Sequence, residues 1–402
     1  MPLRSSSALL LLALCAGSAS ATLPTRATVL AAATRANSYF LNRTTDTACG
    51  WTRGTYMTGL MELWRATGDA ALLDYAFDWA HANEWKLCGK RSTGAEAEAQ
   101  AEAEPEYPPG PKPIKPKGKD DADNEICGAT YAELFVADPA RAGGRAHALG
   151  DLGATLGRQI AGVQRGVTNL WSWIDAIHMG MNAFSRYSVA TEVAPGQGNA
   201  AVLNAMFALY NTTANAGDPP DGIRSFHMWS AEDGLFYRDD RFLGTGTFWG
   251  RGNGWAITAM ARTLQVLPAG AAWDAQRAEY TGKLRAMAAA LAELQGDDGC
   301  WRADLKNATA FPGPEMTGSA NFVNGIAFGI ADGILDKATY MPVLEKGYSC
   351  LTNVALQPSG LFGYCQPIGG SPAAAAANST SDFCVGQFLL ASAAVAKLAP
   401  AM

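Results

Sequence analysis

The chain has 402 residues and a formal net charge of −6, and its lysines and arginines form no basic run. A mildly acidic protein without a basic stripe is a poor partner for nucleic acid or for anionic membranes, so we expect to find neither partner. The chain is long for one ordinary domain, but no linker divides it into two halves with separate patterns.

An export signal is predicted at residues 1–21. Arg4 precedes the apolar run Ala8–Leu14, and Ala19-Ser20-Ala21 is a small-residue site of the kind that signal peptidase cleaves. No later apolar stretch is long enough to span a bilayer. We therefore expect residues 22–402 to form one secreted, monomeric domain. Four Asn-X-Ser/Thr sequons predict a glycoprotein, and they lie at Asn42, Asn211, Asn307 and Asn378.

Residues 94–121 differ in composition from the rest of the chain. An Ala/Glu run is followed there by a Pro/Lys run, and neither run can bury a core face. We predict a disordered surface insertion between two helices, with a linker to a partner site as the alternative. The acidic residues at the end of this insertion lead into an apolar helix, and we expect most of these acids to be solvated in its first turn. Asp123 or Asn124 is the candidate to point inward.

The segment Trp171–Met179 places an aspartate among large apolar side chains. If it opens a helix, Trp171, Asp175, His178 and Met179 share one face. Apolar surroundings favour the protonated form of Asp175, which is the form that can donate a proton. The alternative is that Asp175 caps a helix N-terminus, because aspartate is a preferred cap residue.

Apolar residues with a helical period predict a mainly helical chain. Examples are the stretches 202–210, 284–291 and 323–330. Turn signals recur between such stretches, as at Gly68-Asp69, and alternating runs of β-branched residues are scarce. About a dozen successive helices fit a closed ring of helical hairpins better than a bundle, so the predicted fold is an all-α (α/α)6 barrel.

The segment Trp249–Trp255 reads WGRGNGW. Its tryptophans, Trp249 and Trp255, can offer flat apolar faces to a sugar ring, and Arg251 can hold a carboxylate through two hydrogen bonds. The glycines would let the backbone approach a ligand closely. The alternatives are a tight turn with packed tryptophans, and a structural Arg251 that ties loops together through carbonyl groups.

Cysteine and histidine usage bounds the remaining chemistry. Beyond the predicted signal the chain keeps seven cysteines, so at least one thiol is left over after any internal pairing. Oxidising export makes disulfides plausible, but the sequence does not give their connectivity. No CxxC or Cys/His spacing indicates a metal site, and no cofactor is expected.

Several blocks, in this order, resemble the unsaturated rhamnogalacturonyl hydrolases of glycoside hydrolase family 105 and the related unsaturated glucuronyl hydrolases of family 88. The blocks are WTRGTYMTGLMELWRATGD from Trp51, ADNEICGATYAEL from Ala122, WSWIDAIHMG from Trp171 and WGRGNGW, and then LQGDDGCWRADL, PEMTGSANF and VGQFLLA. The likeness covers nearly the whole chain after residue 21, except the insertion. It implies an (α/α)6 barrel that binds an oligosaccharide ending in a 4,5-unsaturated uronic acid.

The resemblance also implies roles for single residues. The proton-donating aspartate of the family falls on Asp175, and a second acid falls on Asp123, where the following residue of the usual Asp-Asp pair is Asn124. Trp173 and Met179 correspond to pocket walls, Trp249 and Trp255 to stacking platforms, and Arg251 to a substrate contact. A histidine frequent in the family is absent after Phe236-Tyr237, where Arg238 could replace it as a cationic contact; alternatively, His227 or His178 could serve.

Three functions follow from these interpretations. The favoured one is an enzyme that hydrates the C4–C5 double bond of an unsaturated uronide and so releases the neighbouring sugar. The second is an inverting glycosidase in which Asp123 and Asp175 act on saturated oligosaccharides. The third is a carbohydrate-binding barrel without activity. Glu315, Thr317 and Trp301 recur in the family blocks, and for them we predict structural roles.

Overall fold

The computed structural model describes residues 22–88, 121–215 and 226–401. The predicted signal lies outside these ranges, and so does the predicted insertion apart from Asp121. Twelve α-helices are described: α1 (Arg26–Leu41), α2 (Trp51–Thr67), α3 (Ala70–Ala82), α5 (Ala122–Ala137), α6 (Arg145–Gln164), α7 (Ile174–Ala190), α8 (Ala200–Ala214), α9 (Gly250–Leu264), α10 (Asp274–Glu293), α11 (Met316–Ala331), α12 (Lys337–Cys350) and α13 (Asp382–Val395).

Short elements complete the described chain. They are the antiparallel strands β1 (Trp229–Ser230) and β2 (Leu235–Phe236), the 3-10 helices η2 (Asp240–Phe242) and η3 (Ala271–Trp273), and the π-helical turn η4 (Leu351–Ala355).

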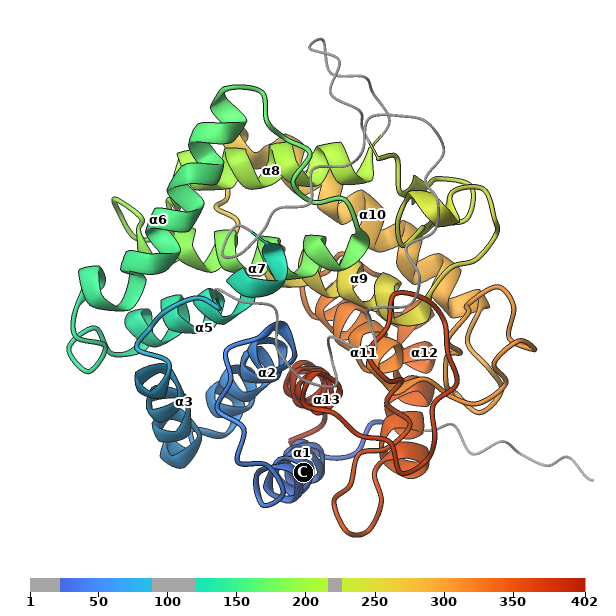
Figure 1. Ribbon diagram of the computed structural model, residues 1–402. Coiled ribbons are helices and arrows are strands. Elements are labelled where there is room, and N and C mark those ends of the chain that lie inside the picture. Colours follow the sequence, from blue (N-terminus) through green and yellow to red (C-terminus); the bar gives the residue numbers. More distant parts are fainter. Residues whose placement is uncertain (1–21, 89–120, 216–225, 402) are drawn as a thin grey trace, which may run out of the picture.

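The helices form two concentric rings, as the view along the barrel in Figure 1 shows. The inner ring contains α2, α5, α7, α9, α11 and α13, and each of these helices packs against the next until α13 closes on α2. The outer ring contains α1, α3, α6, α8, α10 and α12. Inner and outer helices alternate along the chain, so six hairpins form the predicted (α/α)6 barrel, which is confirmed.

Burial explains which helices lie inside. In α9 and α11 nearly every residue is buried, whereas α10 buries only one face. Capping side chains fix where several helices begin. Asp69 accepts a hydrogen bond from the Ala71 amide at the start of α3, and Asn199 accepts one from Val202 at the start of α8. Gly68 ends α2 in the left-handed conformation, with φ 71°.

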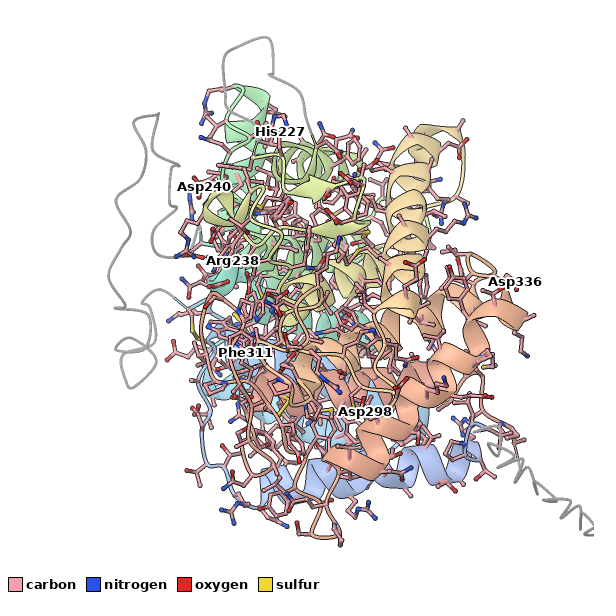
Figure 2. The ribbon with its side chains drawn as sticks, turned by 90° about the vertical axis from the view of Figure 1, so that its right-hand side faces the viewer. His227, Arg238, Asp240, Asp298, Phe311 and Asp336 are labelled. Carbon is pink, nitrogen blue, oxygen red and sulfur yellow. A yellow bond between two sulfur atoms is a disulfide. The ribbon has the colours of Figure 1, made fainter. Side chains whose placement is uncertain are left out.

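All inner helices run in the same direction, because each follows an outer helix that runs back. Their N-termini therefore gather at one end of the barrel, here called the mouth, and their C-termini gather at the other end, the rear. The rear connections are the short segments 68–69, 138–144, 191–199, 265–273 and 332–336. The mouth carries the connections 42–50, 165–173, 294–315 and 351–381, together with the described residues 83–88 and 226–249. Figure 2 places Arg238 and Asp336 on opposite sides of the molecule, at the mouth and the rear respectively.

Three disulfides stabilise the connections at the mouth. They join Cys49 to Cys88, Cys300 to Cys350 and Cys365 to Cys384. Cys127 is buried and unpaired. The structure thus confirms that one of the seven cysteines is left over, and it supplies the pairing that the sequence could not give.

Candidate active site

The two predicted acids occupy the same place in neighbouring inner helices. Asp123 is the second residue of α5, after the N-cap Asp121, and Asp175 is the second residue of α7, after the N-cap Trp173. Because α5 and α7 pack side by side, both carboxyl groups belong to the mouth. The Asp175 side chain is 15% exposed, so it is accessible without being fully solvated.

Arg238 joins these acids into one cluster. Its Nε lies 3.3 Å from Asp175 Oδ2, and its Nη1 lies 2.5 Å from Asp239 Oδ2. Burial lowers the pKa of Arg238, but the charges of Asp175, Asp239 and Asp123 outweigh burial and raise this pKa above its ordinary value. Arg238 is therefore a permanent cation among three carboxylates.

The backbone around Arg238 is held in place from several sides. The amide of Ile174, the residue before Asp175, donates to the Arg238 carbonyl at 2.8 Å. Asn253 accepts from the Phe236 amide at 2.8 Å and donates to the Phe236 carbonyl at 2.9 Å. A Cβ on Gly370 would lie 3.2 Å from the Arg238 guanidinium carbon, so this glycine covers the guanidinium closely.

The surroundings of Asp175 differ from both local interpretations of the sequence. Asp175 does not cap α7, because the helix begins one residue before it and Trp173 is the N-cap. It is not enclosed by apolar groups alone either, since its carboxylate pairs with Arg238. Arg238 comes from a segment 63 residues further along the chain, so no local pattern could reveal it.

Arg251 makes the contacts expected of a structural arginine, which ties loops together through carbonyl groups. It is 1% exposed, and it donates to the carbonyls of Gln366, Pro367 and Gly369, each at 2.9 Å. Burial lowers the pKa of Arg251 to about 10, although Glu315 and Asp175 counteract this, so the side chain remains a cation at neutral pH. As placed, Arg251 holds the segment Gln366–Gly370, here called the clamp loop, rather than a ligand carboxylate.

Three other predicted contact residues lie inside the protein. Met179 and Trp249 are each 1% exposed and Trp255 is fully buried, so none presents a free face to a sugar. Trp249 Nε1 donates to Gln366 Oε1 at 3.0 Å, and the Trp255 ring lies 4.7 Å from that of His178. These packed tryptophans match the alternative that the sequence left open.

The glycines of WGRGNGW serve protein packing. A Cβ on Gly250 would lie 2.6 Å from the Arg302 carbonyl oxygen, and one on Gly254 would lie 3.0 Å from Gly318 Cα. These contacts let α9 approach α11 and the connection before it. The expected close approach to a ligand is thus replaced by a close approach of two inner helices.

Two aromatic residues at the mouth remain partly exposed. One is Trp173, which was predicted to be a pocket wall, and the other is Trp51, the first residue of α2. Trp51 packs on Phe383, with ring centroids 4.9 Å apart. Sequence reasoning did not select Trp51 or commit to Arg238. The signal for Trp51 was its position at the start of an inner helix, like that of Trp173 at the start of α7.

Neither histidine that could replace the family histidine contacts the acids. His178 is fully buried, and burial together with the charge of Arg262 lowers its pKa to about 3. It is therefore neutral at physiological pH. His227 is exposed and adopts a positive φ of 53°. Arg238 occupies the position beside Asp175 instead.

The described chain has a cavity at each end of the barrel. The rear cavity, about 560 Å³, is bordered by Glu62, Glu133 and Arg186 among other residues. Burial raises the pKa of Glu133, but Arg65, Arg262 and Arg186 lower it to about 2 overall. A carboxylate held ionised in this way cannot deliver a proton at neutral pH, so the larger cavity is not the candidate for acid catalysis.

The other cavity lies at the mouth, beside the clamp loop. It measures about 520 Å³, and Tyr39, Arg53, Asp382 and three clamp-loop residues contribute to its lining. Gln366, Pro367 and Ile368 face this cavity, while Gly370 of the same loop contacts Arg238. Helix N-termini favour anionic ligands, and they meet at this end.

Two further features of the described residues bear on other classes of protein. Within ranges 22–88, 121–215 and 226–401, no group of three or more His, Cys, Asp or Glu side chains could hold a metal ion. In the same residues, no helix is long and apolar enough to cross a membrane.

The fold and the mouth define a class: an (α/α)6 barrel with acidic side chains grouped at the N-termini of its inner helices. Residues 28–399 match the family described as Glycosyl Hydrolase Family 88, and the chain belongs to this family. The predicted resemblance to this group of hydrolases is thereby confirmed.

Two curated relatives are both named unsaturated 3S-rhamnoglycuronyl hydrolase. The protein of Formosa agariphila is 31% identical over 245 residues, which are 58% of this chain and 59% of that protein. The protein of Alteromonas sp. is 29% identical over 227 residues, 55% of this chain and 50% of that protein. The matched part of the chain thus spans only half to three fifths of these relatives.

Solved structures match over more of the chain. A glycosyl hydrolase family 88 protein from Bacteroides vulgatus is 29% identical, with a TM-score of 0.75 over 93% of this chain and 99% of that one. The unsaturated glucuronyl hydrolase from Bacillus sp. GL1 is 15% identical, with a TM-score of 0.56 over 91% of this chain and 96% of that one. The second likeness shows the fold alone.

Proposed function

We propose that the protein is a glycosidase that removes a 4,5-unsaturated uronic acid from the end of an oligosaccharide left by a polysaccharide lyase. The observation that carries this proposal is the cluster of Asp175, Asp123 and Arg238 at the mouth. It combines a proton donor, a second acid and a cation in one partly exposed place. Family membership and the names of the curated relatives support it.

In the proposed reaction Asp175 delivers a proton to C4 of the double bond, and water adds at C5. The hemiketal formed in this way opens and expels the neighbouring sugar. Asp123 lies on the adjacent inner helix, where it can orient the water or a hydroxyl group of the substrate. Trp51 and Trp173 are the partly exposed aromatics that can pack against sugar rings. Trp249, Trp255 and Met179 are buried, so the proposal assigns the sugar contacts to the two partly exposed aromatics.

We propose a rhamnose-containing oligosaccharide of the rhamnogalacturonan type as the substrate. The relatives' names contain the term rhamnoglycuronyl, which supports rhamnose next to the uronic acid. The mouth cavity beside the clamp loop has the polar and aromatic lining that further sugars would need.

Loss of the ultraviolet absorbance of the unsaturated uronide tests the reaction. Lyase-generated disaccharides with rhamnose, sulfated rhamnose or glucose-type neighbours should be compared, and the absorbance should fall fastest with a rhamnose-type neighbour. An inverting glycosidase would instead cleave saturated oligosaccharides and leave the absorbance unchanged. Constant absorbance with every disaccharide would contradict the proposal.

The Asp175→Asn variant tests the assignment of the acid. We expect kcat to fall by about 10² to 10⁴, because a positioned general acid contributes about that much. Asp240→Asn is the control, since Asp240 lies two residues after Arg238, at the start of η2, and the variant should retain wild-type turnover. Wild-type turnover in Asp175→Asn would remove the proton donor from the proposal. Sugar binding without turnover in the wild type would indicate a carbohydrate-binding protein.

We further propose that the protein is exported and acts as a monomer. Three disulfides support an oxidising compartment. Among the described residues, the large apolar side chains that are exposed are Val136, Val193 and Val354, which lie on separate elements and form no extended patch. Light scattering of the purified protein should give the mass of one chain, and twice that mass would contradict the monomer.

A further inference from the structure

Arg238 holds its two aspartate partners unequally. Asp239 is 7% exposed, and it also binds Arg241 through the backbone amide and the guanidinium. Asp175 contacts Arg238 through Nε alone, at the longer distance of 3.3 Å. Among the described residues, Asp175 has no other side-chain partner. The Arg238–Asp175 contact is therefore the weaker one.

The Arg238 guanidinium is also the accessible cation of the site. Its side chain is 21% exposed, whereas Arg251 is 1% exposed and its two Nη groups donate to clamp-loop carbonyls. A planar guanidinium binds a carboxylate through two parallel hydrogen bonds. A uronate carboxylate that enters the mouth thus competes with Asp175 for Arg238.

The charges around Asp175 determine whether it binds a proton once Arg238 pairs with a ligand carboxylate. The charged groups near it are Asp123 on α5, Arg238 and Asp239 between β2 and η2, Arg251 on α9 and Glu315 at the start of α11, with Arg241 beyond Asp239. Four carboxylates, that of Asp175 included, face three guanidinium groups. A ligand carboxylate adds one more negative charge, and a proton on Asp175 compensates for it.

We propose that Arg238 is the residue that recognises the substrate carboxylate, and that it leaves Asp175 when the substrate binds, so that Asp175 takes up a proton from solvent. The cation that contacts Asp175 in the free protein is then engaged by the ligand. In this proposal the general acid carries its proton only in the complex with the substrate. This inference rests on the proposed function, but it concerns binding, so it can be measured without turnover.

Binding of glucuronate, a saturated uronic acid without the double bond, tests the proposal. Tryptophan fluorescence gives Kd at several pH values, and calorimetry in two buffers of different ionisation enthalpy gives the protons taken up. For the wild type we expect uptake approaching one proton per ligand, with Kd rising up to tenfold per pH unit. The absence of glucuronate binding, or binding without proton uptake, would overturn the proposal.

Asp175→Asn provides the sharpest comparison. Its side chain no longer competes for Arg238 and cannot ionise. Glucuronate should therefore bind roughly twofold to fivefold more tightly, which is the range expected for releasing a partly exposed ion pair. The dependence of Kd on pH should also disappear. An unchanged Kd with an unchanged pH dependence would show that the ion pair is unrelated to binding.

Arg238→Gln should weaken glucuronate binding on the order of tenfold to a hundredfold. Arg238→Lys keeps the positive charge but cannot donate two parallel hydrogen bonds. Its Kd for glucuronate should therefore lie between those of the wild type and Arg238→Gln. The matched control is Arg241→Gln, since Arg241 also binds Asp239 but does not contact Asp175. An equal loss in Arg241→Gln would assign the effect to the segment as a whole and overturn the role of Arg238.

The same proteins separate this inference from the proposed function. Should glucuronate bind with proton uptake while no unsaturated disaccharide loses absorbance, the enzymatic proposal fails and the role of Arg238 stands. Should absorbance be lost while glucuronate binds without proton uptake, the role of Arg238 fails and the enzymatic proposal stands.

Discussion

Arg251 and Arg238 are both arginines of the mouth, but burial gives them different roles. Arg251 is enclosed and its hydrogen bonds go to backbone carbonyls, whereas Arg238 is partly exposed and pairs with carboxylates. The partners of Arg251 lie more than 100 residues away in the chain, as the separation of 115 from Gln366 illustrates. The sequence predicted an arginine suited to a carboxylate, and only the fold shows which arginine is accessible.

Arg251→Ala should act on stability first. It leaves three carbonyl groups without their donor, so we expect the free energy of unfolding to fall by about 3 to 5 kcal/mol. Urea denaturation measures this change. Arg285→Ala is the control, because Arg285 also donates to a carbonyl, that of Ile334, but on the exposed surface. It should lose no more than about 1 kcal/mol, and equal losses would contradict the structural role of Arg251.

His178 should make stability depend on pH. Its pKa of about 3 in the folded protein lies below the ordinary 6.5, so between these values the unfolded chain binds more protons. The free energy of unfolding should therefore fall as pH decreases from 6.5 towards 3, by up to about 1.4 kcal/mol per pH unit from this group. His178→Gln should lack this component, and the difference between the two denaturation profiles isolates it. Parallel profiles would exclude the effect.

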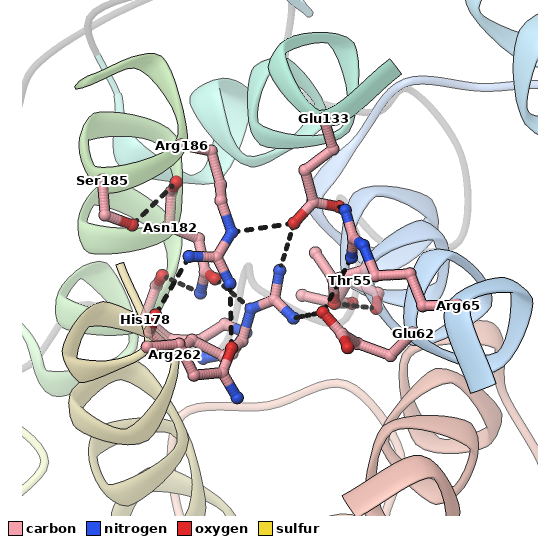
Figure 3. Close-up of polar contacts among 11 residues, drawn as sticks. Thr55, Glu62, Arg65, Glu133, His178, Asn182, Ser185, Arg186 and Arg262 are labelled. Carbon is pink, nitrogen blue, oxygen red and sulfur yellow. Dashed lines mark hydrogen bonds and ion pairs between the residues drawn. The ribbon is translucent and has the colours of Figure 1, made fainter. Parts of the chain in front are cut away.

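Four inner helices are connected at the rear by a network of buried ion pairs, which Figure 3 shows. Glu133 on α5 accepts from Arg186 on α7 and from Arg262 on α9, each at 2.8 Å. Glu62 on α2 lies 3.3 Å from Arg262 and 2.8 Å from Arg65. Because these ion pairs join α5 to α7 and α9, and α9 to α2, the network fixes the distances between these inner helices.

Glu133→Gln should destabilise the barrel by about 3 to 5 kcal/mol, because it leaves the buried Arg186 without its counter-charge and leaves Arg262 with Glu62 alone. Thermal or urea denaturation measures the change. Adding Arg262→Met should cost less than the sum of the two single changes, since Arg262 has already lost one of its two carboxylate partners. Glu293→Gln on the exposed face of α10 is the control. Strictly additive losses would argue against a coupled network.

The period of the apolar residues sufficed to predict the helices and their ring, because the pattern within each segment determines whether one face or all faces of the helix are buried. The caps at Asp69 and Asn199 and the turn at Gly68 are equally local. The contacts of WGRGNGW could not be predicted from local sequence, because the motif binds Phe236 and the clamp loop, which come from other hairpins. Asp175 and Asp123 stay predictions for catalysis, and the structure brings them together around Arg238.

At the scale of the whole molecule, the four sequon asparagines all lie on the surface. Asn42, Asn211, Asn307 and Asn378 are exposed and come from different parts of the chain. When the protein is made in a eukaryotic secretory host, we expect its mass to exceed that of the bare polypeptide and to drop on treatment with an N-glycosidase. Each Asn→Gln change should remove one glycan. A mass equal to the bare polypeptide would contradict both glycosylation and the predicted route of export.

The unequal connections at the two ends of the barrel have a consequence for how such a protein can diversify. Arg238 and the clamp loop of the proposed site belong to mouth connections, while the rear is closed by short segments such as 68–69 and 332–336. Exchanging a mouth segment between homologues should therefore transplant sugar preference and leave the hairpin scaffold intact. The clamp loop is a suitable graft, because Arg251 and the Cys365–Cys384 bridge mark its points of attachment.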